Sequence, residues 1–461
     1  MKVALIRCGA PAAPNALINP PLGLMYLAST LRRANHDPIL FDLKITPQLN
    51  RLERELASFQ PDVFGLSAFS PDAIDLANVA AWLKQRFPGM PIVAGGPHAT
   101  SNPDDTLARG DIDFAVIGEG EATFVELLNR LDGDAAATPG VATRDGQVLR
   151  FAPTRPLLDD LDLLPYPAWD LIDIEAYAHF YGATPVGKGR YMPVFTSRGC
   201  PYRCTYCHRI FGKRFRKRSA ENVIGEIIEL RERFGINRIE ICDDIFNAVP
   251  ARAIAICNEI AEKAPGTRLS FPNGLRADVM TPEVLAAMKR AGAYLISYAV
   301  ETATPRLQAM VKKHVNLEKA RAVIARTAAE GIYTNGFFML GFPSETEAEV
   351  RSTVDFACST KLHSMSAYIF VPFPNSEIYD EIAASKPNLS LGSGFDYHTG
   401  AVNCSNVPTP KLHRLKRNMY LKFYFRSGRI LRTLWAHPDK GSLPSLAWIM
   451  LKRLFSRRGM T

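Results

Sequence analysis

The stretch Ser197–Cys207 reads SRGCPYRCTYC and carries three cysteines, Cys200, Cys204 and Cys207. A structural zinc site takes four ligands, and no fourth Cys or His follows at an ordinary spacing. His208 is adjacent to Cys207 and is poorly placed to complete a tetrahedron with it. Three thiolates suit a [4Fe–4S] cluster in which one iron has no protein ligand and stays open to a substrate or cofactor. The stretch therefore favours an iron–sulfur cluster, with zinc as the alternative.

The cysteines follow the first of six short apolar segments that alternate with helical patterns. The expected strands are 194–197, 238–242, 268–272, 294–300, 333–340 and 366–371, and the expected helices are 219–234, 250–263, 281–291, 317–330 and 344–360. Six β/α units in about 190 residues fit a partial, TIM-like (β/α)6 barrel better than a second open sheet. Such a barrel keeps its chemistry at the carboxyl ends of its strands, which is where the cysteines fall.

A separate alternating series precedes the barrel. Strands are expected at 3–6, 38–41, 63–67, 92–94 and 114–117, and helices at 22–34, 48–58, 72–87, 103–109 and 121–131. Short apolar strands separated by helices indicate a parallel sheet covered on both faces, the doubly wound or Rossmann-like arrangement. Ligands bind at the carboxyl ends of such strands, where glycine lets the backbone approach them. The candidate residues there are Gly95, Gly96, Gly118 and Glu119.

The fold class is therefore α/β, in four regions. We expect a doubly wound domain at 1–135, a proline-rich linker at 136–190 that begins with a hairpin at 141–151, a partial barrel at 191–400 and a basic helical region at 401–461. The 47% of apolar and 22% of charged residues are typical of globular proteins and exclude a disordered chain. No uncharged apolar run approaches the roughly 18 residues of a membrane span, and the start of the chain is too weakly apolar for a signal peptide. These features predict a cytoplasmic protein.

The net charge of +9 is concentrated in the last region. Residues 411–461 contain thirteen Lys or Arg and one acidic residue, Asp439, so their surplus of +12 leaves residues 1–410 at −3. The basic residues are interleaved with apolar ones, and the segment 446–455 is too short to span a bilayer but suits its interface. The tail is either a helix packed on the barrel with a solvated basic face or a peripheral membrane contact, which would fit a lipid-like substrate.

The cysteine stretch resembles the signature of the radical S-adenosylmethionine (SAM) superfamily. The resemblance implies that the three cysteines hold a [4Fe–4S] cluster and that SAM binds the open iron. It also implies that an electron from an external flavodoxin or ferredoxin cleaves SAM to methionine and a 5′-deoxyadenosyl radical. Positions that match the family's SAM-binding motifs are Tyr206 for adenine, Asp243 and Asp244 for the amino group, Arg276 and Glu301 for the carboxylate and ribose, and Gly341 for adenine.

The first domain resembles the cobalamin-binding domain found ahead of many radical SAM enzymes. This class includes the anaerobic Mg-protoporphyrin cyclase, hopanoid-modifying enzymes and antibiotic methylases. The segments that carry the resemblance are 21–28, 95–99 and 113–124. The string Asp-x-His-x-x-Gly, which supplies a histidine ligand to cobalt in mutase-type domains, does not occur in the chain. Cobalt would lack that ligand, and we expect His36 and His98 to be solvated loop residues.

Together these features predict a cobalamin-dependent radical SAM methyltransferase that acts on an unactivated carbon of a small molecule. The 5′-deoxyadenosyl radical would remove a hydrogen from that carbon, methylcobalamin would supply the methyl group, and a second SAM would restore methylcobalamin. The sequence names neither a catalytic side chain nor the substrate.

Other functions fit the sequence less well. The first alternative is a radical cyclisation or rearrangement without net methyl transfer. A remote alternative is a zinc-stabilised RNA-binding protein that uses the basic run 209–218. It leaves the β/α series unexplained, so no nucleic-acid partner is expected. A tRNA methylthiotransferase would carry three more cysteines in its first domain, where only Cys8 occurs.

Overall fold

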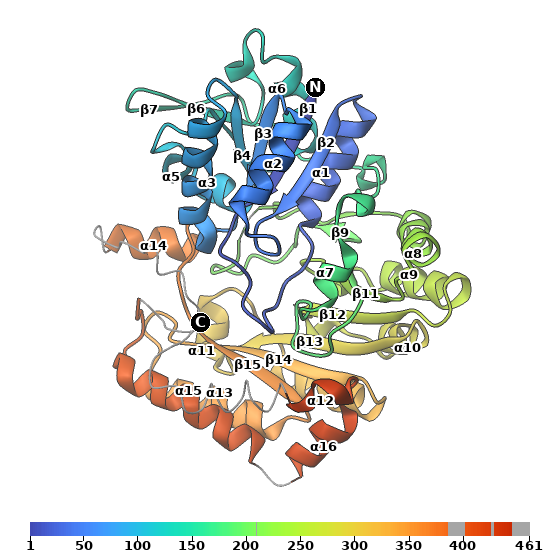
Figure 1. Ribbon diagram of the computed structural model, residues 1–461. Helices are drawn as coiled ribbons and strands as arrows, with labels where there is room; N and C mark the ends of the chain where they lie inside the picture. Colours follow the sequence, from blue (N-terminus) through green and yellow to red (C-terminus); the bar gives the residue numbers. More distant parts are fainter. Residues whose placement is uncertain (209, 386–401, 426–427, 445–461) are drawn as a thin grey trace. The chain divides into compact units, whose positions relative to one another are not determined.

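The computed structural model describes residues 1–208, 210–385, 402–425 and 428–444 (Figure 1). The chain divides into two compact units, Met1–Tyr177 with His208–Gly212, and Ala178–Cys207 with Lys213–Thr461. Among the described residues, no helix combines the length and the apolar character needed to cross a membrane.

The first unit is built on a seven-stranded sheet in the order β2-β1-β3-β4-β5-β6-β7. Its five parallel strands are β1 (Lys2–Arg7), β2 (Asp37–Asp42), β3 (Val63–Ser67), β4 (Ile92–Gly95) and β5 (Phe114–Val116). The strand order reverses at β1, because β2 lies on one side of it and β3 on the other. This reversal is the switch point of a doubly wound sheet, at whose carboxyl edge ligands bind.

Helices connect these strands, as the apolar periodicity predicts. They are α1 (Leu22–Arg33), α2 (Leu49–Phe59), α3 (Ala73–Arg86), α4 (Gly96–Ser101), α5 (Pro103–Leu107), α6 (Gly120–Asn129) and, later in the chain, α7 (Ile174–Ala178). Helix α4 was not expected, since Gly96 and Pro97 indicate a loop. Proline is tolerated in a first helical turn, where its missing N–H has no partner in any case.

The expected hairpin is present, and it extends the sheet of the first unit. Strands β6 (Val141–Asp145) and β7 (Val148–Phe151) pair antiparallel, and β6 pairs antiparallel with β5. The ordered sheet thus continues into the segment expected to be a linker.

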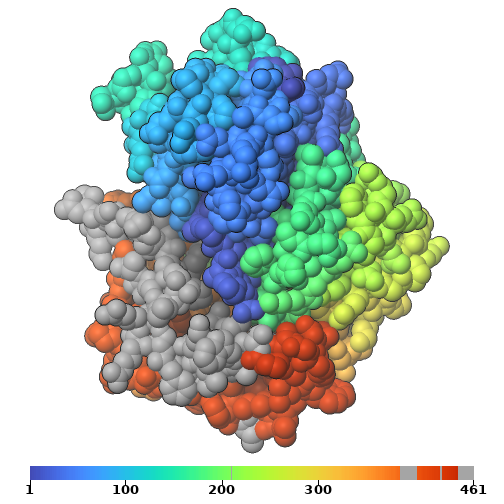
Figure 2. Space-filling model, in the orientation of Figure 1, coloured from blue at the N-terminus to red at the C-terminus, as the bar shows by residue number. Residues whose placement is uncertain are grey.

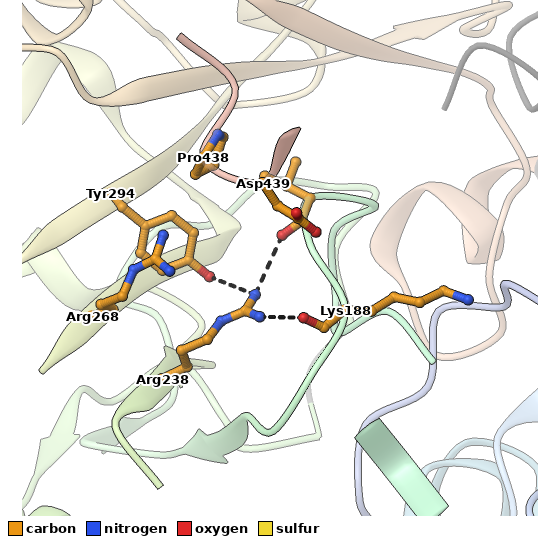
Figure 3. A pocket seen from close by; sticks show the side chains of 7 residues that line it. Lys188, Arg238, Arg268, Tyr294, Pro438 and Asp439 are labelled. Atoms are coloured by element: carbon orange, nitrogen blue, oxygen red, sulfur yellow. Dashed lines mark hydrogen bonds between the residues drawn. The ribbon is translucent and has the colours of Figure 1, made fainter. Parts of the chain in front are cut away.

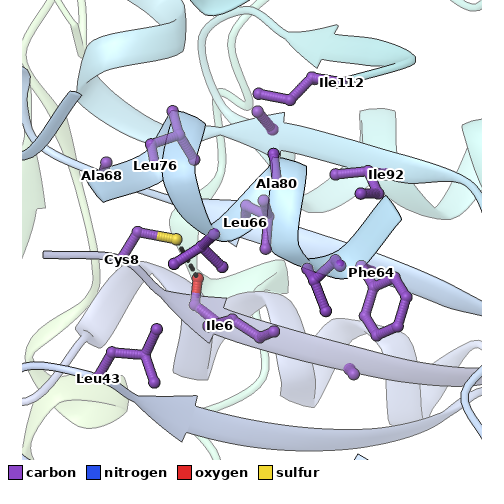
Figure 4. Packing of buried hydrophobic residues seen from close by; sticks show 14 of the residues in the cluster. Ile6, Cys8, Leu43, Phe64, Leu66, Ala68, Leu76, Ala80, Ile92 and Ile112 are labelled. Carbon is purple, nitrogen blue, oxygen red and sulfur yellow. Dashed lines mark hydrogen bonds between the residues drawn. The ribbon is translucent and has the colours of Figure 1, made fainter. Parts of the chain in front are cut away.

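The core of the first unit lies between the sheet and its helices. Cys8, directly after β1, packs there among Leu43, Leu66 and Leu76, and its Sγ lies 4.0 Å from the carbonyl oxygen of Ile6 (Figure 4). Burial raises the pKa of this thiol, so it stays protonated and acts as a small apolar side chain.

The second unit is built on a six-stranded sheet in which every pair is parallel. Its strands follow the chain in order: β8 (Met192–Val194), β11 (Arg238–Ile241), β12 (Arg268–Leu275), β13 (Ala293–Glu301), β14 (Tyr333–Leu340) and β15 (Ser364–Ile369). A parallel sheet whose neighbours are consecutive strands has the connectivity of the expected partial (β/α)6 barrel.

The helices of this unit lie between the strands in sequence. They are α8 (Ala220–Phe234), α9 (Pro250–Lys263), α10 (Pro282–Arg290), α11 (Pro305–Met310), α12 (Leu317–Ala329), α13 (Glu347–Ser359) and α14 (Glu377–Ser385). Helices α8, α9 and α10 pack side by side along β11 and β12 (Figure 1). The short helices α11 and α14 were not expected.

The first expected barrel strand, 194–197, differs from the structure. Strand β8 ends at Val194, and Ser197–Arg198 form β9, which pairs antiparallel with β10 (Arg216–Lys217). The physical reason lies at the end of β11, where Asp243 accepts the backbone N–H groups of Thr196 and Ser197. These residues therefore leave the sheet and turn toward the cysteines.

The expected helical tail contains α15 (Thr409–Tyr424) and α16 (Arg429–Ala436). Helix α15 packs on α13 and buries Leu412, Leu415 and Met419, while its basic side chains Arg414 and Arg417 are exposed. The apolar segment 446–455 lies outside the described residues.

Candidate functional site

The three cysteines lie on the loop that follows β9, at the carboxyl end of the barrel sheet. Gly199, with a φ of +82°, turns the chain from β9 into this loop. Cys200, Cys204 and Cys207 are half-buried free thiols, and the N–H of Cys207 donates to the carbonyl of Cys204 at 3.2 Å. The N–H of Thr205 donates to the carbonyl of Val311 at 3.1 Å, which ties the loop to the segment after α11.

The chemistry of these donors fits an iron–sulfur cluster. Burial raises the pKa of Cys207 to about 12 and that of Cys200 above its ordinary value, and neighbouring thiolates add to both effects, whereas Lys213 opposes them. Three thiolates crowded on one loop repel one another, so a cationic iron centre would stabilise them. In the described part of the chain, no three Cys, His, Asp or Glu side chains converge on the position of a single metal ion. A [4Fe–4S] cluster binds each thiolate through a different iron.

Asp243 and Asp244, predicted at the SAM amino group, lie beside the start of the cysteine loop. Asp243 is 2% exposed and accepts four hydrogen bonds, from the N–H and the hydroxyl of both Thr196 and Ser197. Asp244 accepts the N–H of Gly199 at 3.1 Å. Both carboxylates therefore hold the backbone that leads to Cys200.

Tyr206 and Glu301, predicted at SAM, are brought together by a residue that the sequence did not single out. The Lys313 ammonium donates to the Tyr206 hydroxyl at 3.0 Å and lies 3.6 Å from the Glu301 carboxylate. Lys313 is 7% exposed and Glu301 is 8% exposed. Burial raises the pKa of Glu301, and Lys313 opposes that rise. These three side chains form a closed polar cluster behind the cysteine loop.

Lys313 is held by a strained segment. Glu301, Lys312 and His314 all have positive φ angles, of +67°, +51° and +51°. Such backbone is unfavourable for these residues and persists only where its surroundings enforce it. Gln308 supplies part of that support, since its amide donates to the carbonyls of Val300 and Thr302 and accepts the N–H of Val315.

Arg276, predicted at the SAM carboxylate or ribose, supports the same segment. It donates to the carbonyls of Lys313 and His314 at 2.8 and 3.2 Å and pairs with Asp278 at 2.8 Å. Its guanidinium lies 4.1 Å from the centre of the Tyr202 ring, on the cysteine loop. Arg276 thus connects the end of β12 with two loops of the site.

Gly341, the last of the predicted SAM residues, follows β14 with a φ of +92°. Its N–H and that of Phe342 donate to one carboxylate oxygen of the fully buried Glu345. Burial raises the pKa of Glu345 to about 7, and the two backbone donors oppose this rise. A Cβ at Gly341 would approach Leu412 to 2.9 Å, so the turn requires glycine twice over.

The candidate residues of the first unit all lie at the carboxyl edge of its sheet. Gly95 ends β4, and Gly96 follows with a φ of +83°, where a Cβ would meet the Ser67 hydroxyl at 2.5 Å. The N–H of Gly118 donates to the Thr100 hydroxyl at 3.0 Å, and the Glu119 carboxylate accepts the N–H of Leu158 at 3.1 Å.

His98 does not fit the expectation of a solvated loop residue. It is 3% exposed on α4, its Nε2 lies 3.0 Å from the Asp105 carboxylate, and its Nδ1 lies 3.4 Å from the Ser70 hydroxyl. Burial lowers the pKa of its imidazole. The unexpected helix α4 places this side chain inside the unit.

The basic run 209–218 is largely internal where it is described. Arg216 and Arg218 are buried, and Arg218 forms an ion pair with the fully buried Glu226 of α8. Guanidinium groups committed in this way to the fold are poor candidates for contacts to RNA phosphates.

Comparisons with known proteins identify both units. The B12 binding domain family matches residues 12–128, and the Radical SAM superfamily matches residues 194–357. An uncharacterized methyltransferase of Pyrococcus horikoshii is 30% identical over 95% of each chain. The chain belongs to the radical SAM superfamily. Within it, the chain is one of the members that carry a B12-binding domain.

Other relatives of this radical SAM enzyme carry two kinds of name. The chain is 27% identical to the cytidylyl-2-hydroxyethylphosphonate methyltransferase of Streptomyces wedmorensis, over 78% of this chain and 77% of that one. It is 26% identical to the anaerobic magnesium-protoporphyrin IX monomethyl ester cyclase of Synechocystis, over 94% of this chain and 86% of that one. The solved structure of the cobalamin-dependent radical enzyme OxsB has the same fold, with a TM-score of 0.72 at 19% identity, covering 98% of this chain and 76% of that one.

These findings confirm the expected fold class and the resemblance to radical SAM enzymes with a cobalamin domain. They also confirm the expected cofactors, a [4Fe–4S] cluster, SAM and cobalamin. As a radical SAM enzyme the protein acts on a small molecule and takes electrons from an external reductant. The RNA-binding alternative is therefore set aside. The assignment of individual residues to each cofactor stays a prediction.

The thiol assignment can be tested by iron content. Replacing Cys204 by Ala removes one of three cluster ligands, so anaerobically reconstituted Cys204→Ala should hold far less than the roughly four irons of the wild type and should not cleave SAM on reduction. Cys404→Ala is the matched control, because Cys404 is a half-buried free thiol outside the loop. Full iron content and SAM cleavage in Cys204→Ala would contradict the assignment.

The buried cluster around Lys313 predicts a pH-dependent loss of stability. Lys313→Met leaves the Glu301 carboxylate buried without its cation, and breaking a buried pair costs about 3–5 kcal/mol. Urea unfolding should show this loss near pH 8. The loss should shrink as the pH falls toward 4.5, because the native carboxyl of the variant binds a proton at a pH where the unfolded chain does not.

Lys312→Met is the control for this variant. Lys312 is exposed and pairs at the surface with Glu377, so its replacement should cost less than about 1 kcal/mol at any pH. Equal losses in the two variants, or a loss in Lys313→Met that does not change with pH, would refute the buried pair.

Proposed function

We propose that the protein transfers a methyl group to an unactivated carbon of a small molecule, by radical SAM chemistry that depends on cobalamin. The observation that carries the proposal is the combination in one chain of a B12-binding domain with a radical SAM domain whose three cysteines follow the first barrel strand. Methyltransferases among its relatives support this function. The cyclase relatives keep a radical cyclisation without methyl transfer as the alternative.

In this proposal the chain's own residues divide into three groups. The cluster ligands are Cys200, Cys204 and Cys207; the residues toward SAM are Tyr206, Asp243, Asp244, Arg276, Glu301 and Gly341; and the residues toward cobalamin are Gly95, Gly96, Gly118 and Glu119. When bound, the cluster and SAM supply a radical that takes hydrogen from the substrate, and cobalamin supplies the methyl group. The protein's task is to orient these groups and exclude competing reactants.

Several contacts support this division. Asp243 and Asp244 hold the start of the cysteine loop and so define where Cys200 lies. Lys313 holds Tyr206 and Glu301 in a site nearly closed to water, where charges interact more strongly than in solvent. The electron donor in this proposal is a flavodoxin- or ferredoxin-type protein.

We further propose that helix α16 attaches the enzyme to an anionic membrane and that the substrate is poorly soluble in water. The observation that favours this is the inverted polarity of the helix. Arg429, Arg432 and Thr433 face the protein, where they donate to backbone carbonyls at or near the end of α13. Ile430, Leu431, Leu434 and Trp435 face outward.

The outward side chains form an unusually apolar surface. Trp435 is 82% exposed, Leu431 is 74% exposed, and Phe425 just before the helix is 69% exposed. The residues of α16 lie in the red part of the surface in Figure 2. An amphipathic helix with Trp and Leu on one face lies in a membrane interface, and basic residues strengthen its binding to anionic lipid. The exposed Arg414 and Arg417 of α15 and the positive charge of the tail supply that attraction.

Product mass tests the methyl transfer. With SAM labelled at its methyl group, the reconstituted enzyme should return a product heavier by one labelled CH2 per turnover, and omission of cobalamin should abolish it. The substrate is sought by incubating the enzyme with fractionated small-molecule extracts. Turnover that yields a product of rearranged skeleton without the label would establish the cyclase alternative instead.

Cosedimentation with vesicles tests the membrane proposal. The double variant Leu431→Glu/Trp435→Glu should lose most of its binding to anionic vesicles, because it places two charges on the inserting face. Val148→Glu/Phe151→Glu is the matched control, since both residues are 60% exposed on β7. Wild-type binding should weaken with salt. Equal binding of the two double variants, or a dimer in solution that only Leu431→Glu/Trp435→Glu disrupts, would sink the proposal.

A further inference from the structure

A cavity lies at the end of the barrel sheet opposite the cysteines. Its volume is about 200 Å³. Arg238 and Arg268 are the first residues of β11 and β12, and Tyr294 is the second residue of β13, so the cavity sits at the amino ends of three adjacent strands. Figure 3 shows their side chains gathered there. The lining residues are Val186, Lys188, Arg238, Arg268, Tyr294, Pro438 and Asp439.

One of the two arginines is committed to the cavity wall. Arg238 donates to the carbonyls of Val186, Gly187 and Lys188 and to the Tyr294 hydroxyl at 3.4 Å. Because the hydroxyl of Tyr294 accepts this hydrogen bond, its own proton stays available to an acceptor in the cavity. Arg238 therefore shapes the wall and orients a second donor.

Arg268 has donors to spare. Its guanidinium lies over the Tyr294 ring, 4.7 Å from the ring centre, and it makes no hydrogen bond or ion pair with another described residue (Figure 3). A guanidinium stacked on a ring keeps its N–H edge open, and that planar edge matches two oxygens of a phosphate. Stacking also holds the side chain in one orientation, which lowers the entropic cost of binding.

The charges of the lining favour an anion. Three cations, Lys188, Arg238 and Arg268, face one carboxylate, Asp439. The Lys188 ammonium lies 5.2 Å from the Tyr181 ring centre and points away from Arg238 in Figure 3, so it adds to the potential more than to direct contact. One oxygen of Asp439 accepts the N–H of Gly441 at 3.0 Å. The surplus is two positive charges.

The end of α16 forms one wall of this cavity. Ala436, the last residue of the helix, packs against the cluster of Val186, Leu295 and Tyr333, and Pro438 and Asp439 follow it in the chain. The cavity therefore adjoins the helix whose outer face carries Trp435.

We propose that this cavity is a phosphate-binding site in which Arg268 and the Tyr294 hydroxyl donate to the phosphate oxygens. The phosphate belongs either to a free phosphorylated molecule or to the headgroup of a phospholipid, and both present the same oxygens. The site is separate from the methyl-transfer chemistry and does not rest on it.

Calorimetric titration of the full-length protein with inorganic phosphate, at constant ionic strength, tests the site. Wild-type protein should bind one equivalent, and Arg268→Gln should weaken binding about tenfold, as expected for a lost charge-assisted pair. Tyr294→Phe keeps the stacking ring and should weaken binding less. Arg326→Gln, which removes an exposed arginine on α12, should not change it.

Vesicles distinguish the two sources of phosphate. Phosphatidylcholine vesicles with and without phosphatidic acid are compared for the wild type and Arg268→Gln, whose melting temperatures are first shown to agree. Binding of phosphatidic acid that depends on Arg268 assigns a headgroup, whereas binding of inorganic phosphate alone that depends on Arg268 assigns a free molecule. No saturable binding of either, or equal binding by Arg268→Gln, would overturn the proposal.

Discussion

The carboxylate of Asp243 is the group on which the site of the barrel unit depends. It lies just after β11 and accepts four hydrogen bonds from Thr196 and Ser197, so it takes the chain out of the sheet after β8. That departure lets β9 pair with β10 and lets Gly199 turn the chain into the cysteine loop. A buried carboxylate is costly unless its oxygens are satisfied, and here the loop satisfies them. The fold and the position of the thiols are thus stabilised by the same contacts.

The geometry of a parallel sheet brings the remaining candidates of the unit to the same edge. Asp244, Arg276, Glu301 and Gly341 come after four different strands, yet all lie at carboxyl ends. Their partners come from the connecting loops. Lys313 reaches Tyr206 and Glu301 from the segment after α11, and Arg276 and Gln308 hold that segment in its unfavourable backbone conformation. Strain at this point is offset by hydrogen bonds that only the assembled unit can supply.

The tail contains two helices with opposite designs. Helix α15 buries an apolar face and exposes basic residues, as a surface helix usually does. Helix α16 buries Arg429, whose guanidinium donates to three carbonyls at and after the end of α13, and exposes Leu431 and Trp435 instead. The carbonyls at a helix end lack partners within their helix, so they are suitable acceptors for a buried arginine. This anchoring explains how an apolar face can be held outward.

The sequence by itself determined the two α/β units, most of their strands and helices, and the identity of the cysteine loop. It could do so because period-2 and period-3.6 patterns, and the spacing of three cysteines, are local properties of the chain. It did not reveal Lys313, since nothing distinguishes it from Lys312 until the fold buries one and exposes the other. The tertiary structure alone also decided the burial of His98, the exit of Ser197 from the sheet and the outward face of α16. Each of these depends on a partner distant in sequence, namely Asp243 for Ser197 and the end of α13 for Arg429. Their energies appear only when the chain has brought those partners together.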